Sequence, residues 1–160
     1  MTQSKSKSKS KSCYGLYSVL VLLSVLVVFL SAHAEPVGSH LVRVFPDSAG
    51  RWTTAGHING RAVTFRIDLE ASTLVISPSE AVRLGIDPSR GVSSPIHTPT
   101  GMVFAQRLKL DRVGVGRIEL RHIDAVVLPT DNPKTLLLGR SFLDHVQLRQ
   151  EGQVLVLQQK

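Results

Sequence analysis

The strongest candidate for chemistry is an acidic residue at the end of a predicted strand. Residues 65–75 read Phe-Arg-Ile-Asp-Leu-Glu-Ala-Ser-Thr-Leu-Val. Apolar and polar residues alternate over Val63–Ile67, which is typical of a strand with one face on a core, and Asp68 follows at a turn. A carboxylate held there can act as a general acid or base. Alternatively, Asp68 only accepts hydrogen bonds from its own loop, as turn-forming Asp residues do.

A second informative segment, residues 136–143, reads Leu-Leu-Leu-Gly-Arg-Ser-Phe-Leu. It predicts an apolar strand, a turn at Gly139 and a short helix. It lacks the second Gly of a serine nucleophile elbow. The six His residues form no His-Glu-x-x-His pattern, and the single Cys13 excludes a disulfide framework or a cysteine-based structural zinc site. We therefore expect no metal and no cofactor.

The elements that must position these residues are mainly strands. Asn59-Gly60 lies between two strand-like runs, and the pair predicts a hairpin because both central residues of a type I′ turn need positive φ. Further turns are expected at Pro99-Thr100-Gly101, Gly114–Gly116 and Glu151–Gly152. The sequence therefore predicts an all-β domain over residues 35–160.

Two short helices interrupt the predicted strands. Ser77-Pro78-Ser79-Glu80 has the pattern of a capping box with Pro at the first helical position, and Gly85 supplies the stop. A shorter helix is expected to begin near Ser141. Pro88–Pro99 is rich in Ser, Gly and Pro and is expected to be a loop entering a hairpin.

The N-terminal region is typical of an export signal. Residues 1–15 are basic and lack an apolar face, so they are expected to be disordered. Residues 16–34 contain a run of apolar residues that ends in Ala32-His33-Ala34, a pattern of signal peptidase sites. The segment is either a cleaved signal peptide or an uncleaved transmembrane anchor. Residues 35–160 are then periplasmic or extracellular, either secreted or tethered to the inner membrane.

The charge distribution argues against nucleic acid as a partner. The chain of 160 residues carries a formal net charge of +7, of which four charges come from Lys residues in the first 34 positions. Subtracting these four from seven leaves +3 for residues 35–160, a modest balance for a nucleic-acid surface.

The order of these segments resembles the retropepsin-like aspartic proteases, and in particular a bacterial, exported, single-lobe branch. In that branch a hairpin precedes Asp-Thr-Gly-Ala-Ser/Thr, and Leu-Leu-Gly-x-Ser-Phe-Leu closes the domain. The resemblance spans roughly residues 40–158. It implies a closed β-barrel lobe with one or two short helices, preceded here by the apolar signal or anchor helix.

The resemblance also implies a site and a partner. Asp68 is the catalytic residue, Pro99, Thr100 and Gly101 form a flap over an extended peptide, and Gly139 and Arg140 form the closing loop. Aspartic proteases need two carboxylates that share one proton. Because one lobe supplies one Asp, the resemblance implies a twofold homodimer. The predicted strands Val146–Gln150 and Val154–Gln158 are expected near the interface, and truncation after Arg149 is expected to weaken dimerisation.

The active-site loop, Leu69, Glu70, Ala71 and Ser72, departs from the family pattern. The family Thr donates a hydroxyl across the dimer axis, whereas Leu69 has none. The family Gly allows a tight turn, whereas Glu70 adds a side chain and further acid near the axis. We expect Glu70 to recruit Arg66 or Arg140, to be protonated, or to push the loops apart. Arg140 is expected to reach Glu70 or Asp144.

Three functions therefore remain open. The first is an exported aspartic endopeptidase, a hydrolase that acts as a homodimer on extended peptides. The second is a pseudoprotease that binds a peptide or a protein without cutting it. The third is a β-barrel interaction domain in which Asp68 is only structural.

Overall fold

The computed structural model describes residues 40–98, 101–131 and 134–160. The chain divides into two units, Met1–Gly38 and Ser39–Lys160, and the described residues all belong to the second. The expected basic region 1–15 and the apolar segment 16–34 lie outside the described residues. Among the helices of the described ranges, none is long and apolar enough to cross a membrane.

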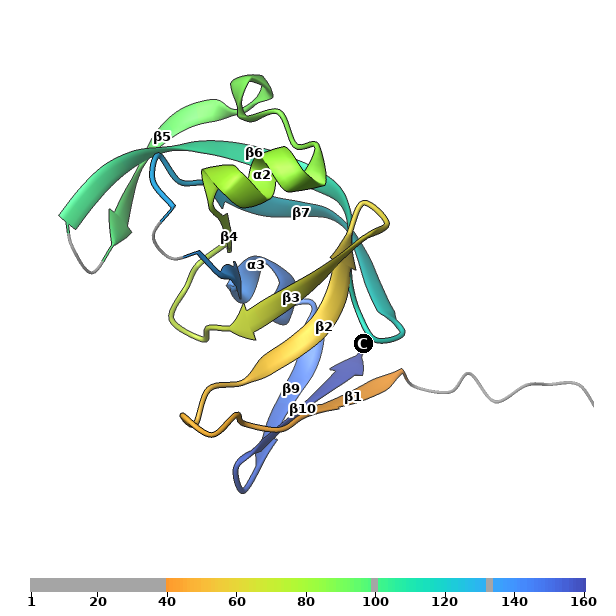
Figure 1. Ribbon diagram of the computed structural model, residues 1–160. Helices are drawn as coiled ribbons and strands as arrows, with labels where there is room; N and C mark the ends of the chain where they lie inside the picture. The colour runs from red at the N-terminus through yellow and green to blue at the C-terminus, as the bar shows by residue number, and fades with distance from the viewer. Residues whose placement is uncertain (1–39, 99–100, 132–133) are drawn as a thin grey trace, which may run out of the picture. The chain divides into compact units, whose positions relative to one another are not determined.

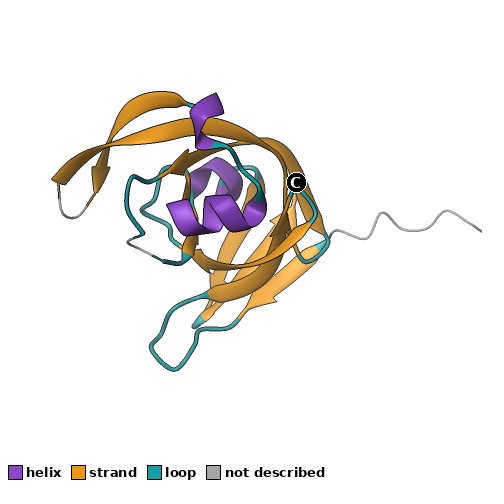
Figure 2. Ribbon diagram, turned by 45° about the horizontal axis from the view of Figure 1, so that its top comes forward, coloured by secondary structure: helices purple, strands orange, loops and turns teal. Residues whose placement is uncertain are grey.

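Strands make up most of the second unit, and helix is confined to short segments (Figure 2). The strands are β1 (Leu41–Val44), β2 (Thr53–Ile58), β3 (Arg61–Ile67), β4 (Leu74–Ile76), β5 (Val92–Thr98), β6 (Gly101–Val115), β7 (Ile118–Val127), β8 (Leu136–Leu138), β9 (Val146–Glu151) and β10 (Val154–Gln159). The helical segments are α2 (Pro78–Leu84), the 3₁₀ turn η1 (Pro88–Arg90) and α3 (Arg140–Leu143).

Six strands close into a barrel. The larger sheet has the order β2-β3-β8-β4-β7-β6-β5, and β2 also pairs with β6, which joins the two sides of the sheet. β5 and the first part of β6 extend beyond the ring as a hairpin (Figure 1). The predicted all-β closed barrel with a few short helices is confirmed.

The short strand β8 lies between β3 and β4 and so determines where the loop that carries Asp68 runs. It pairs parallel to β3, with Phe65 opposite Leu136, and antiparallel to β4, with Val75 opposite Leu137. β4 in turn pairs parallel to β7. The loop between β3 and β4 must therefore pass over the end of β8, and this loop carries Asp68.

A second sheet of three strands completes the core. Its order is β1-β10-β9, and Val44, Val146, Leu155 and Leu157 from it join the same buried cluster as the barrel side chains. Trp52 Nε1 donates a hydrogen bond to the carbonyl of Gln153 at 2.7 Å, linking the start of β2 to the β9–β10 turn. The unit 39–160 thus contains its own core and has what a domain needs to fold alone.

The hairpin turns agree with the local sequence signals. Asn59 and Gly60 have φ values of 50° and 83°, as a type I′ turn requires, and they join β2 to β3. Gly152, with φ of 61°, lies at the turn between β9 and β10. The turn expected at Gly114–Gly116 lies at the end of that segment, because Gly114 and Val115 belong to β6 and Gly116, with φ of 57°, makes the turn.

Gly114 has a packing role instead. A Cβ atom at this position would lie 2.0 Å from Cε1 of His57. The absence of a side chain at Gly114 therefore allows the His57 ring to lie across β6. His57 Nε2 also lies 3.0 Å from a carboxylate oxygen of Glu119, and this hydrogen bond lowers the pKa of Glu119.

The predicted helices are confirmed, and one predicted loop is wrong. Ser77 Oγ accepts a hydrogen bond from the Glu80 amide, and Gly85 ends α2 with φ of 64°. The segment Pro88–Pro99 was expected to be a loop, but Val92–Thr98 forms β5. The pairing with β6 overrides weak local propensity, and an edge strand can accept Pro95 because its outer side needs no N–H donor.

Candidate active site

The two oxygens of Asp68 have different surroundings. Oδ1 accepts hydrogen bonds from the amides of Glu70, at 3.0 Å, and Ala71, at 3.2 Å. The Asp68 amide donates to the carbonyl of Leu138 at 3.1 Å. Oδ2 accepts no hydrogen bond from the residues that the structure describes. The Asp68 side chain is half-buried. The hydrogen bonds of the loop therefore fix the carboxylate through Oδ1 and leave Oδ2 available.

The closing loop holds the Asp68 loop from the other side. The amide of Arg140 donates to the carbonyl of Ala71 at 2.8 Å, and the amide of Ser141 donates to the carbonyl of Ser72 at 3.1 Å. The Leu74 amide donates to Ser141 Oγ at 3.0 Å. The structure therefore joins the two segments that the sequence singled out, through backbone atoms.

Gly139 permits this close approach. A Cβ atom at Gly139 would lie 2.3 Å from the carbonyl oxygen of Thr73 and 2.5 Å from that of Ala71. Both neighbours are backbone atoms that cannot turn aside. Glycine is needed here for space, since its φ of −100° is one that other residues adopt.

Ser141 is a positioning residue that the sequence analysis did not select. Its hydroxyl satisfies the first amide of β4, at the point where the chain leaves the Asp68 loop. The available signal was a small polar residue within an otherwise apolar run, between Gly139 and Phe142. From the sequence, Ser141 is expected only to begin the short helix.

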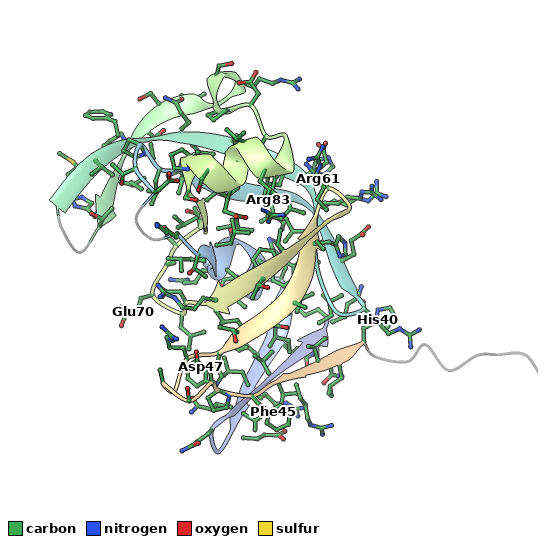
Figure 3. All side chains as sticks on the ribbon, in the orientation of Figure 1. His40, Phe45, Asp47, Arg61, Glu70 and Arg83 are labelled. Atoms are coloured by element: carbon green, nitrogen blue, oxygen red, sulfur yellow. The ribbon has the colours of Figure 1, made fainter. Side chains whose placement is uncertain are left out.

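The two residues that depart from the family pattern face outward. Leu69 is 40% exposed, which is high for a large apolar side chain. Glu70 is exposed, and Figure 3 shows its side chain projecting away from the barrel. Within the described ranges Glu70 forms no ion pair, whereas Arg140 Nη2 lies 3.4 Å from a carboxylate oxygen of Asp144. Of the two partners expected for Arg140, the structure places Asp144 beside it.

The β5–β6 hairpin is attached to the strand that leaves the Asp68 loop. Its inner side chains Ile96 and Ala105 pack in one apolar cluster with Val75 of β4 and with Val126 and Leu128. Of the expected flap residues, Gly101 begins β6 with φ of 123°. Pro99 and Thr100 lie outside the described residues.

The outer face of the same hairpin carries exposed apolar residues. Met102 is 62% exposed and Phe104 is 65% exposed. They lie opposite His97 and Pro95 in the strand register. In the described part of the chain, no group of three or more His, Cys, Asp or Glu side chains gathers in a way that could hold a metal ion.

Comparison with known proteins identifies the family. Residues 54–145, more than half of the chain, match the family model described as "gag-polyprotein putative aspartyl protease". The chain belongs to the retropepsin-like aspartic protease family. The range that matches this retropepsin-like family contains the Asp68 loop, the β5–β6 hairpin and the closing loop at Gly139 and Arg140.

A solved structure shares the retropepsin-like fold. A retropepsin-like aspartic protease from Rickettsia conorii aligns with a TM-score of 0.67 and 23% sequence identity, covering 75% of this chain and 91% of that one. A curated Sinorhizobium sp protein, described as "Uncharacterized protein in cobV 5'region", is 26% identical over 170 residues. That alignment covers 90% of this chain and 73% of the relative.

Proposed function

We propose that this retropepsin-like protein is an exported aspartic endopeptidase that hydrolyses extended peptides as a homodimer. The observation that carries the proposal is the state of Asp68. Its Oδ1 is fixed by two amides of its own loop, and its Oδ2 accepts no hydrogen bond from the described residues of its own chain. A positioned carboxylate with one available oxygen is what acid–base catalysis requires.

The chemistry needs two such carboxylates. One ionised Asp68 accepts a proton from a water molecule, whose oxygen adds to the carbonyl carbon of the scissile peptide bond. The protonated Asp68 of the second copy donates a hydrogen bond to the carbonyl oxygen. The C–N bond then breaks as the nitrogen takes a proton from the pair. Each chain supplies one Asp68, so the site is complete only in a dimer.

The substrate class follows from the hairpin and the barrel edge. β5 is the edge strand of the larger sheet and forms a hairpin with β6, which is anchored to β4. An extended peptide can lie against such a hairpin and form strand-like hydrogen bonds. We therefore propose a peptide or protein substrate bound in an extended conformation, with no cofactor and no metal.

The proposed activity is tested by peptide hydrolysis. A chain beginning at Glu35 is incubated with a library of extended peptides from pH 3 to pH 7, and products are identified by mass spectrometry. We expect cleavage that a pepstatin-class inhibitor blocks, and we expect Asp68→Asn to lower the rate by roughly a thousandfold because the proton-sharing pair is lost. Cleavage that survives Asp68→Asn would contradict the proposal.

A second candidate function, peptide binding without cleavage, is favoured by Leu69 and Glu70. The family's hydroxyl is missing at Leu69, and the exposed Glu70 carboxylate adds acid close to the Asp68 pair. Binding of library peptides without products at any pH, together with unchanged binding in Asp68→Asn, would select this function over the endopeptidase.

Export is proposed from the N-terminal sequence. The basic stretch, the apolar run and Ala32-His33-Ala34 occur in the order of a secretory signal. We expect a phosphatase reporter that is active only after export to be active when fused after Lys160, and to lose this activity when residues 1–34 are removed. Equal reporter activity with and without residues 1–34 would contradict export through this segment.

A further inference from the structure

A cavity of about 370 Å³ lies beside the Asp68 loop. Its apolar lining comes from the loop, from α3 and from β9, and consists of Leu69, Leu143, Val146 and Leu148. Of these lining residues, Leu143 and Val146 are buried, with 4% and 3% of their surfaces exposed. These apolar lining residues suit an apolar side chain, because placing one against them removes both surfaces from water.

The cavity also has charged lining residues. These are Arg140, Asp144 and Lys160. The Arg140–Asp144 pair is 3.4 Å apart, and both side chains are about 60% exposed, at 62% and 61%. An exposed pair of this kind contributes little to stability, so Arg140 is free to bind a second carboxylate. Lys160 Nζ donates to the backbone carbonyl of Asp144, and its positive charge lies at the cavity.

The adjacent loop presents the complementary pair of groups. Leu69 is an exposed apolar side chain on the edge of the cavity, and Glu70 is an exposed carboxylate that has no ion pair among the described residues. Figure 3 shows Glu70 projecting from the loop into solvent. One surface therefore carries the exposed apolar side chain of Leu69 and the carboxylate of Glu70. Beside them lies an apolar cavity with two cationic side chains, those of Arg140 and Lys160.

We propose that the occupant of this cavity is a second copy of the chain, with Leu69 of each copy entering the other's cavity and Glu70 of each copy binding the other's Arg140. An interface between two identical copies around a twofold axis must be self-complementary, so that each contact occurs twice. This surface meets that condition, because it carries both Leu69 and the cavity that would receive it, and both Glu70 and the Arg140 that would bind it. The inference rests on the proposed homodimer and names the residues that hold it.

The contact gives a physical role to the residues that depart from the family pattern. The resemblance implies a hydroxyl contact across the axis at the position of Leu69. In this chain an apolar contact and an ion pair replace it, and the ion pair neutralises the acid that Glu70 would otherwise add near the Asp68 carboxylates. Leu69 and Glu70 together then replace the family's hydroxyl contact with a different contact between the two copies.

Charge reversal tests the interface. In the chain beginning at Glu35, Glu70→Lys or Arg140→Glu places like charges opposite each other. We expect each to raise the dimer dissociation constant at least tenfold in sedimentation equilibrium. The double variant restores opposite charges with exchanged signs, and we expect it to return to within about threefold of the natural value.

Matched controls separate this contact from net charge and from folding. Asp111→Lys and Arg117→Glu change the net charge equally, and both residues are exposed on β6 and at the β6–β7 turn. For the apolar half, Leu69→Ala is compared with Val82→Ala, since Val82 is 80% exposed on α2. We expect the controls to leave dimerisation unchanged, and thermal unfolding verifies that each variant is folded.

The outcomes distinguish this inference from the proposed function. The interface would be overturned if the single charge reversals left the dimer dissociation constant unchanged, or if the double variant dimerised as weakly as the single variants. A natural chain that stays monomeric at 100 µM would also overturn it. A dimer that is insensitive to these changes but cleaves peptides would keep the endopeptidase and reject this interface. A dimer that responds as expected but cleaves no peptide would keep the interface and reject the endopeptidase.

Discussion

A Gly139→Ala variant is expected to lose at least about 3 kcal/mol of unfolding free energy, among the largest effects that a single methyl group has. The added Cβ would lie 2.3 Å and 2.5 Å from two backbone carbonyl oxygens of the Asp68 loop. Relief requires the loop to move away from α3, which breaks the hydrogen bonds from the Arg140 and Ser141 amides. The same shift would displace Asp68, so any hydrolytic activity should fall with stability.

Urea unfolding followed by circular dichroism measures the loss, and Gly152→Ala is its matched control. Gly152 has φ of 61° but nothing within 4 Å of its missing Cβ, so Ala there meets conformational strain without a clash. Strain of this kind costs about 1 to 2 kcal/mol. If Gly139→Ala costs no more than Gly152→Ala, the close packing of the Asp68 loop on Gly139 is wrong.

Truncation after Arg149 is expected to abolish folding altogether. The sequence alone predicts that this deletion weakens dimerisation, but β10 is the central strand of the smaller sheet and pairs with both β1 and β9. The deletion removes Leu155, Val156 and Leu157, each with 1% or less of its surface exposed. At roughly 1.5 to 3 kcal/mol for each buried side chain, the loss approaches the whole stability of a typical domain.

Amide chemical-shift dispersion and circular dichroism report the result. Deletion of Lys160 alone is the control, because this residue follows β10 and is exposed. A truncated chain that keeps a cooperative unfolding transition would show that β10 is dispensable. In that case the barrel would have to be stable without the smaller sheet.

Local signals in the sequence predicted the local structure well. Asn59-Gly60 specifies its hairpin because positive φ at two successive positions is costly for most residues. Ser77, Pro78 and Gly85 specify α2 because the groups that cap a helix lie within one turn of its ends. The apolar run 136–138, followed by glycine, was sufficient to predict the strand β8 and the short helix α3.

Features that depend on distant partners were not predictable in the same way. β5 has the composition of a loop, and only the hydrogen bonds from β6 make it a strand. The role of Ser141 depends on the Leu74 amide, 67 positions away in the chain.

The pairing of β1 with β10 has a consequence for how the chain acquires its structure. Leu41 lies opposite Gln158, which is 117 positions later in the chain. β3 likewise cannot form its pairing with β8, in which Phe65 lies opposite Leu136, until that later strand is present. Closing such long loops costs chain entropy before any contact repays it, which makes barrels of this kind slow to fold. The nascent chain therefore cannot close its barrel before β8 has been synthesised, and it cannot complete the smaller sheet before β10 has been synthesised.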